Sequence, residues 1–342
     1  MKNIIITHSD LDGIMGGILG MLYTGSSNVM YMPNPNPGAT NTAIDMMVEN
    51  YKGPLTLTVV DRCSPTVDYI ESLKDRGIDI VKYTICDHHI TSMPDHKAAI
   101  DAIGPEKCIA MLDTELSGTE NIYKLIEEKY PKLANIVSTV GNWDTFRWKD
   151  MDNLAQYEAK KLNGICAVLG NRARQVFSDI VMNTMKCEID PLHYIFTKYD
   201  ILADIYNDKI ADSKRDSLAY GVRTVVTNSN GDKCKLLLAT FLDYSIISQV
   251  ADDILFDPDE NIDVVVFLHS SGSVSVRSKS TSFLTAKDVA VKVGEMTGLG
   301  GGGHILAAGT KWQSGYDWSE TAESIVLKSL EDMDLKIEHV FK

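Results

Sequence analysis

Short runs of β-branched residues alternate with helix-like segments along the first 150 residues, and this alternation constrains the fold more than any other feature. Strands that are separated by helices pair in parallel through right-handed crossovers. We therefore predict an α/β fold with a parallel sheet in the N-terminal domain. Its strands are expected at residues 3–7, 28–32, 55–60 and 78–85.

The sequence pattern changes twice after residue 150. Residues 151–215 carry apolar residues at helical spacing with few helix breakers, which indicates a helical connector that ends where the sequence turns polar at 211–217. From residue 216 onward, strand-like runs flank turn sequences that are typical of hairpins. Thr285 and Asp288 have the spacing of a capping box and predict the start of a helix. We expect a smaller α/β domain at the C-terminal end.

Charge and apolar content exclude several classes of protein. The chain carries 33 Lys and Arg against 47 Asp and Glu, a formal net charge of −14, so we expect no long duplex DNA as a partner. The apolar stretches are too short to span a bilayer, and the N-terminal residues do not resemble a signal peptide, so we expect no membrane partner. The six cysteines lack C-x-x-C spacing, which indicates free thiols and a cytoplasmic protein.

Acidic and histidine residues follow directly on three predicted strands. They are His8, Asp10 and Asp12 after the first strand, Asp61 after the third, and Asp87, His88 and His89 after the fourth, with Asp144 after a later helical segment. Ligands of open parallel sheets bind at the carboxyl ends of the strands, so these side chains should share one edge. A single aspartate there is usually a turn residue or a helix cap, and Asp10 or Asp12 could simply cap the next helix. Clustered carboxylates repel one another, however, and a divalent cation removes that penalty.

The mixture of ligands indicates which metal to expect. Several carboxylates with two or three imidazoles and no thiolate motif suit a six-coordinate ion, with Mn²⁺ as the first choice and Mg²⁺, Co²⁺ or Fe²⁺ as alternatives. There are more candidate ligand residues than one ion can bind. We therefore expect two divalent metal ions about 3.5–4 Å apart that share a carboxylate. Such a pair would hold a water, lower its pKa and direct it at phosphorus.

The chain contains six motifs in the order HSDLDG, VVDR, DHH, NWD, VRSK and GGGGH. This ordered set resembles the DHH phosphoesterase family. The resemblance covers nearly the whole chain. It is to the branch with an associated C-terminal domain, which contains nanoRNase-type oligoribonucleases and RecJ-type exonucleases. It implies a DHH catalytic domain at 1–150, a helical connector at 151–215 and a substrate-binding DHH-associated domain at 216–342. It also implies an active site in the cleft between the two domains.

The resemblance assigns a role to each motif residue. One metal ion would be bound by His8, Asp10 and Asp61, and the other by Asp12, Asp61, His88 and Asp144, with Asp61 bridging. His89 would face the phosphate as a hydrogen-bond donor or proton source, and Asp87 would orient a histidine. The rest of the substrate would be held by Arg277, Gly301, Gly302, Gly303 and His304.

The residue chemistry agrees with these substrate contacts but leaves alternatives open. Arg277 can bind a phosphate with two N–H groups, or form a surface salt bridge. The glycine run lets backbone N–H groups approach a phosphate, although such runs often only end helices. Trp143, Phe146 and Trp148 could stack on a base, but packing is the commoner use of such residues.

The leading hypothesis is a metal-dependent phosphodiesterase that shortens very short RNA to mononucleotides. One alternative is a phosphatase or phosphodiesterase of small nucleotides, such as 3′-phosphoadenosine 5′-phosphate or cyclic dinucleotides. A non-catalytic nucleotide sensor is a further alternative from another class, but every expected metal ligand is present.

Overall fold

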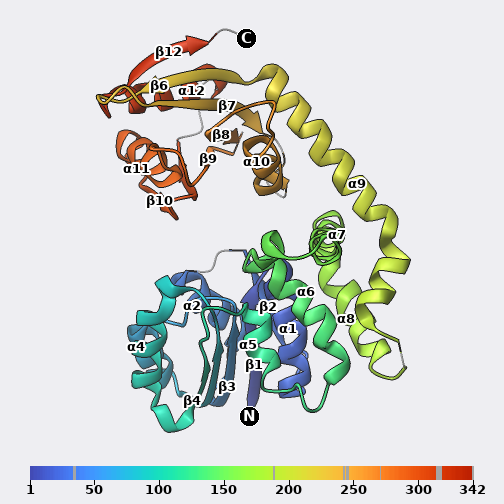
Figure 1. Cartoon of the computed structure of the whole chain (residues 1–342). Helices are drawn as coiled ribbons and strands as arrows, with labels where there is room; N and C mark the ends of the chain where they lie inside the picture. Colours follow the sequence, from blue (N-terminus) through green and yellow to red (C-terminus); the bar gives the residue numbers. More distant parts are fainter. Residues whose placement is uncertain are drawn as a thin grey trace. The chain divides into compact units, whose positions relative to one another are not determined.

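The computed structural model describes residues 1–33, 36–187, 189–241, 243, 246–269, 271–312 and 318–340. The chain forms two compact units, Met1–Asp204 and Ile205–Lys342, and Figure 1 labels most of their elements. Each unit has its own hydrophobic core. Among the described residues, no helix combines the length and apolar character that crossing a membrane requires. The six cysteines are free, as expected.

The first unit is built on a five-stranded sheet in the order β2-β1-β3-β4-β5, and every neighbouring pair is parallel. Its strands are β1 (Lys2–His8), β2 (Val29–Met32), β3 (Gly53–Val60), β4 (Ile78–Cys86) and β5 (Cys108–Met111). The parallel sheet and its first four strands confirm the prediction. The fifth strand was not predicted, because it is a short edge strand without a β-branched run.

Helices cover both faces of this sheet (Figure 1). One face carries α2 (Pro37–Val48), α3 (Val67–Asp75) and α4 (Met93–Ile103). The other carries α1 (Leu11–Thr24), α5 (Gly118–Tyr123), α6 (Ala134–Asp144), α7 (Asn153–Leu169) and α8 (Ala173–Thr184). Short 3₁₀ turns lie at Ile90–Ser92, Pro105–Lys107, Pro131–Leu133, Arg147–Asp150 and Gly170–Arg172. The central strands are buried on both sides, which explains their continuous apolar runs.

The region expected as a helical connector is helical, but α7 and α8 belong to the first compact unit. The long helix α9 (Pro191–Tyr220) continues through the polar segment 211–217, where the sequence suggested a boundary. Polar residues on the exposed side of a helix produced that misleading signal. The compact units divide between Asp204 and Ile205, inside α9. The functional division of the chain into three segments stays a prediction.

The second unit contains a seven-stranded sheet in the order β10-β11-β9-β8-β7-β6-β12. The strands are β6 (Val222–Thr227), β7 (Lys233–Phe241), β8 (Val264–His269), β9 (Ser273–Ser278), β10 (Gly301–Gly303), β11 (Ala307–Lys311) and β12 (Lys336–Val340). The helices are α10 (Ile247–Leu255), α11 (Ala286–Thr297) and α12 (Trp318–Glu331). Both predicted hairpins are present, and Thr285 and Asp288 form the expected capping box of α11.

Candidate active site

The carboxyl ends of three adjacent strands bring the predicted residues together at one edge of the first sheet. His8 is the last residue of β1, Asp61 directly follows β3, and Asp87 directly follows β4. Three groups of side chains have ligand atoms within 4.8 Å of one another. The first contains His8, Asp10 and Asp61, the second Asp12, His88 and Asp144, and the third Asp61, Asp87, His88 and His89. The structure therefore brings the predicted residues together, and their roles as metal ligands stay a prediction.

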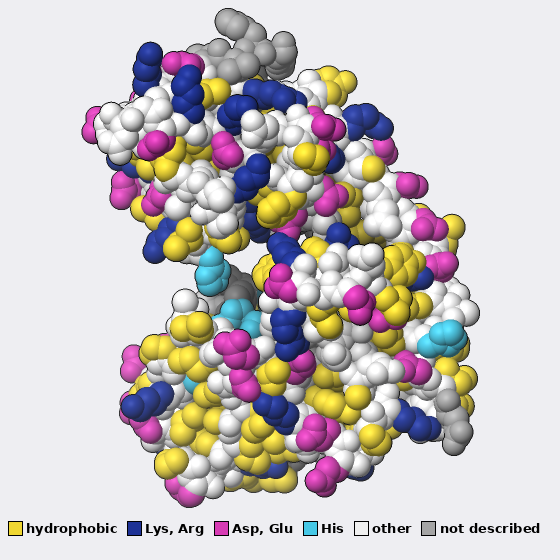
Figure 2. Space-filling view, in the orientation of Figure 1, with side chains coloured by type: hydrophobic (Ala, Val, Ile, Leu, Met, Phe, Trp, Pro, Cys, Tyr) yellow, Lys and Arg dark blue, Asp and Glu magenta, His cyan; other side chains and the backbone are white. Residues whose placement is uncertain are grey.

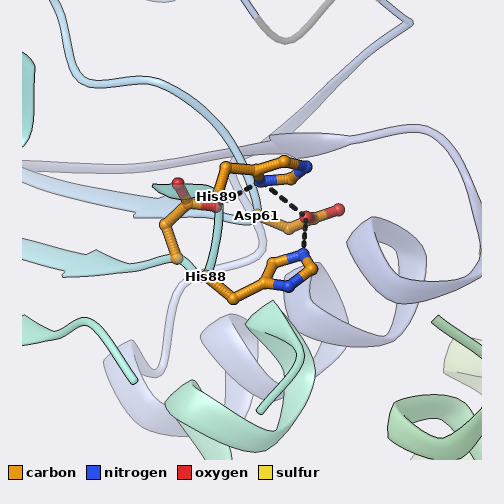
Figure 3. A group of neighbouring side chains, drawn as sticks. Asp61, His88 and His89 are labelled. Atoms are coloured by element: carbon orange, nitrogen blue, oxygen red, sulfur yellow. Dashed lines mark hydrogen bonds and ion pairs between the residues drawn. The ribbon is translucent and has the colours of Figure 1, made fainter. Parts of the chain in front are cut away.

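Asp61 belongs to the first group, and its carboxylate directs one oxygen to His8 and the other to His88 of the second group. Its Oδ2 is 3.7 Å from His8 Nδ1, and its Oδ1 is 3.5 Å from His88 Nε2. The ring of His89 also turns toward this carboxylate, with 3.8 Å between its Nδ1 and Asp61 Oδ1 (Figure 3). A carboxylate in this position suits a bridge between two cations.

The backbone at Asp61 is turned into a left-handed conformation, with φ at 54°. Its N–H donates to the Cys86 carbonyl at 2.8 Å, which fixes the end of β3 against β4. The next residue, Arg62, is fully buried and donates to the carbonyl of Thr7 and the hydroxyl of Thr40. Arg62 therefore ties the sheet edge together beneath the cluster, and the strained conformation is held by its surroundings.

Asp12 is held by the N-terminus of α5. Its two carboxylate oxygens accept from the backbone N–H groups of Gly118 and Thr119 at 2.8 and 2.9 Å, where the helix dipole favours a negative charge. A Cβ on Gly118 would lie 2.6 Å from Asp61 Cβ, so the close approach requires glycine. Sequence reasoning missed Gly118 and Thr119, although the capping box of Ser117 and Glu120 marks this helix start.

Asp10 caps α1, one of the two roles that the sequence left open, and its carboxylate also contacts His8. Its Oδ1 caps α1 by accepting from the Gly13 N–H at 2.9 Å, and its Oδ2 lies 2.7 Å from His8 Nδ1. His8 Nε2 lies 3.1 Å from the carbonyl oxygen of Pro33 and therefore carries a proton. Burial lowers the pKa of His8, but the hydrogen bond to Asp10 and the charge of Asp10 together raise it by more. The pKa of His8 therefore lies above its ordinary value. With a cation present, His8 Nδ1 can act as a ligand.

The donor atoms of the cluster fit divalent metal ions. Asp61 Oδ2, His88 Nε2 and Asp144 Oδ2 are buried without a hydrogen-bond partner. Burial and the charge of Asp12 raise the pKa values of Asp61 and Asp144 well above the ordinary range. His88 Nε2 lies 3.2 Å from Asp144 Oδ2 as an ion pair, but none of these atoms has a hydrogen bond, and a cation would neutralise the carboxylates. Carboxylates with imidazoles and no thiolate suit Mn²⁺, Mg²⁺ or Fe²⁺.

Asp87 has a ligand atom within 4.8 Å of those of Asp61, His88 and His89, but both of its oxygens are engaged by histidines. It is fully buried, and its oxygens accept from His89 Nδ1 at 2.9 Å and from His96 Nε2 at 2.7 Å. Burial favours the neutral acid, but these two hydrogen bonds keep the pKa of Asp87 well below its usual range. The chain of contacts continues from His96 to Ser64 at 2.7 Å and from Ser64 to Tyr83 at 2.6 Å. No sequence signal identified these three residues, which lie away from the strand ends.

In the second unit, Arg277 lies in β9 as predicted. Its Nη1 donates to the Ser275 hydroxyl at 3.1 Å and to the Val276 carbonyl at 3.0 Å, and its Nη2 donates to the Ser248 hydroxyl at 2.9 Å. These contacts hold the guanidinium against α10 and the end of β9. Such a fixed guanidinium suits a phosphate or carboxylate group.

The three glycines that the sequence offered as phosphate contacts, Gly301, Gly302 and Gly303, form the edge strand β10. The backbones of His304 and Ala307 exchange two hydrogen bonds. In an antiparallel pair of strands, hydrogen-bonded and non-hydrogen-bonded residue pairs alternate. Gly301 and Gly303 are therefore in non-hydrogen-bonded pairs, and their N–H groups point away from β11. Ala307 also pairs with Arg277, so His304 and Arg277 lie on one row across the sheet.

The fold and this cluster define a class of protein, an α/β protein with a carboxylate–imidazole metal centre at the carboxyl edge of a parallel sheet. Residues 2–140 match the family model described as "DHH family, N-terminal domain", and this part of the chain is a DHH-family domain. The domain, the fold and the acidic cluster together support a metal-dependent phosphoesterase. A comparison with curated proteins found no match.

Several solved structures resemble the chain in fold. RecJ from Thermus thermophilus in complex with Mn²⁺ has 12% identity and a TM-score of 0.58, over 96% of this chain and 52% of that protein, so the chain spans about half its length. An exonuclease RecJ bound to manganese has 14% identity and a TM-score of 0.54, over 97% and 89%. A pGpG-specific phosphodiesterase, PggH from Vibrio cholerae, has 12% identity and a TM-score of 0.50, over 97% and 100%. These likenesses show the fold alone.

Proposed function

We propose that this protein is a dinuclear metal-dependent phosphodiesterase that hydrolyses short oligoribonucleotides to mononucleotides. The observation that carries the proposal is the Asp61 carboxylate, which directs one oxygen to His8 and the other to His88. His8, Asp10 and Asp61 would hold one ion, and Asp12, Asp61, His88 and Asp144 the other. When bound, the ions would supply Lewis-acid chemistry, neutralising phosphate oxygens and lowering the pKa of water.

His89 would take part in the reaction as a donor to the phosphate. Its side chain is 39% exposed, and its Nδ1 proton is committed to Asp87, so Nε2 is left for the substrate. The hydrogen bond to Asp87 raises the pKa of His89, which favours the doubly protonated ring that donates from both nitrogens. Asp87 would act through His89 by keeping the ring oriented.

The residues of the second unit would hold the rest of the substrate. Arg277 would pair with a non-scissile phosphate or a terminal one, and the outward N–H groups of Gly301 and Gly303 are suitable donors to phosphate oxygens. Gly302 and His304 complete the same short hairpin. These roles rest on donor chemistry and on the family motifs.

A short substrate is favoured over a long one for two reasons. Lys and Arg are interspersed with acidic side chains on the described part of the face in Figure 2, without a continuous basic stripe. PggH is named as specific for pGpG, a linear dinucleotide, which belongs to the proposed size class. A phosphatase or phosphodiesterase of 3′-phosphoadenosine 5′-phosphate or cyclic dinucleotides remains the alternative.

A time course on end-labelled RNA di-, tri- and pentanucleotides with Mn²⁺ tests the proposal. The small and cyclic nucleotides named above are run in parallel, and the double variant Asp87→Ala, His88→Ala is the inactive control. We expect Mn²⁺-dependent release of mononucleotides, fastest from the shortest chains. Turnover of only the small nucleotides would support the alternative. Tight nucleotide binding without any turnover would indicate a sensor.

A further inference from the structure

The backbone at Phe146 has an unusual conformation for a bulky residue. Among the described residues, five that are not glycine have a positive φ, and four of these are Asn or Asp, which tolerate the left-handed region. Phe146 is the exception, with φ at 60°. A large side chain in this conformation costs conformational energy, and such strain is concentrated at functional sites.

Burial of the ring does not offset this cost, because the Phe146 side chain is exposed. Its exposed fraction is 59%, whereas that of Trp148 is 6%. Trp143 and Trp148 stack on one another with ring centroids 5.6 Å apart and an interplanar angle of 11°. Of the three aromatic residues that the sequence offered for base stacking, the two tryptophans therefore pack with the protein, and Phe146 presents its ring to solvent.

The turn that carries Phe146 directly follows α6, the helix that ends at Asp144. Asp144 is the last residue of α6, and the Phe146 N–H donates to the Trp143 carbonyl in the same helix at 3.2 Å. The Lys149 N–H in turn donates to the Phe146 carbonyl at 3.1 Å, and its ammonium lies 5.0 Å from the centroid of the Phe146 ring. An exposed aromatic ring with a cation beside it thus lies two residues after Asp144.

We propose that Phe146 is the platform on which a nucleobase of the substrate stacks. An aromatic face binds any base, because every base has a π face, while the neighbouring Lys149 adds attraction for the negatively charged nucleotide. This inference rests on the proposed function and assigns a residue that would bind the base of its substrates. Inorganic phosphate chains and sugar phosphates offer no such face. The competing use of an exposed ring is contact with a second protein or a second copy of this chain.

Calorimetric titration of the Mn²⁺-loaded protein with AMP and with ribose 5-phosphate tests the inference without requiring turnover. We expect the wild type to bind AMP at least fivefold more tightly than ribose 5-phosphate, which corresponds to about 1 kcal/mol of stacking. Phe146→Ala should lose this preference while its affinity for ribose 5-phosphate stays unchanged. Phe146→Trp should restore the preference.

Phe146→Asn is the matched control for the backbone, since Asn tolerates the left-handed conformation and has no ring. It should bind like Phe146→Ala and melt no lower than the wild type. An AMP preference that survives in Phe146→Ala overturns the inference, as does an equal loss of affinity for both ligands. A change of oligomeric state in Phe146→Ala, with the AMP preference intact, would assign the ring to a protein contact instead. Dinucleotide turnover by the wild type is measured separately, so loss of the proposed activity and loss of the stacking role are distinguishable.

Discussion

His96 Nε2 donates a hydrogen bond of 2.7 Å to Asp87 Oδ2. Because the Asp87 carboxylate only accepts, this bond and the one from His89 fix both of its oxygens. When His96 Nδ1 acts as an acceptor, the Ser64 hydroxyl can donate to it and the Tyr83 hydroxyl can donate to Ser64. With these donors and acceptors, each buried polar side chain from Asp87 to Tyr83 has a hydrogen-bond partner. The residues that hold Asp87, and through it His89, therefore reach into the core.

Replacing His96 should therefore weaken catalysis without removing metal. In His96→Gln the side-chain amide nitrogen reaches the position of Nε2 and can still donate to Asp87, whereas the shorter amide of His96→Asn cannot. We expect His96→Asn to lower kcat about tenfold or more with little change in KM, and His96→Gln to retain most of the activity. Steady-state kinetics on an RNA dinucleotide and elemental analysis of bound Mn²⁺ measure both effects. Equal losses in the two variants would contradict the positioning role.

Metal removal should expose the repulsion among the carboxylates. The folded-state pKa values of Asp61 and Asp144 are raised, first by burial and then by the charge of Asp12. A raised pKa means that the folded state binds these protons more readily than the unfolded state. In EDTA, the thermal midpoint should therefore rise as the pH falls from above the raised pKa values toward the ordinary value of 3.8. Melting curves between about pH 8 and about pH 5 measure this dependence.

Asp61→Asn is the control for this experiment. At high pH, the thermal midpoint of this variant should lie above that of the metal-free wild type, by roughly 2–4 °C for each kcal/mol of relieved repulsion. Its midpoint should also rise less than that of the wild type when the pH is lowered. Asp87 contributes in the opposite sense, because its lowered pKa provides stability that is lost only at still lower pH. A metal-free wild type whose midpoint falls steadily over the same range would show that the cluster does not repel as described.

Gly118→Ala should disrupt the metal site from the side of α5. The added methyl group would lie 2.6 Å from Asp61 Cβ and 2.9 Å from Asp12 Oδ2, so the helix N-terminus must move away from both carboxylates. We expect Mn²⁺ affinity to fall about tenfold or more, as for other groups that orient ligands. Gly38→Ala is the matched control, since its nearest contact would be an ordinary 3.4 Å. Calorimetric titration of both variants with Mn²⁺ provides the comparison, and equal affinities would contradict the assigned role of Gly118.

The sequence predicted the residues at the strand ends but not the residues that support them. His8, Asp61 and Asp87 were found because buried β-branched runs ended at them, and parallel strands place such ends at one edge. Gly118 lies 106 residues from Asp12, and nothing local in either segment indicates their contact. His96 lies inside the amphipathic helix α4, where a histidine usually has no special partner. Supporting contacts of this kind depend on the tertiary arrangement.

The glycine run illustrates a second limit. The run was predicted to let backbone N–H groups approach a phosphate. Gly301, however, has room only for hydrogen for another reason, because a Cβ would collide with the Ala290 carbonyl oxygen. Gly303 has φ at 141° and a similarly close neighbour in Ala308. Close packing against α11 and β11 therefore explains part of the glycine requirement, and it does not exclude a role for the outward N–H groups.

Arg277→Ala should weaken substrate use while the metal stays bound. The guanidinium is held by Ser275 and Ser248 in the second unit, whereas all proposed metal ligands belong to the first. We expect KM for an RNA dinucleotide to rise about tenfold or more, with the Mn²⁺ content unchanged, because a charge-assisted phosphate contact is lost. Arg277→Lys should recover only part of the loss, since an ammonium lacks the planar pair of donors. Arg223→Ala removes an arginine that pairs with Glu260 in the same unit and should leave the kinetics unchanged. Loss of Mn²⁺ in Arg277→Ala, or an equal effect of Arg223→Ala, would contradict the substrate-binding role of Arg277.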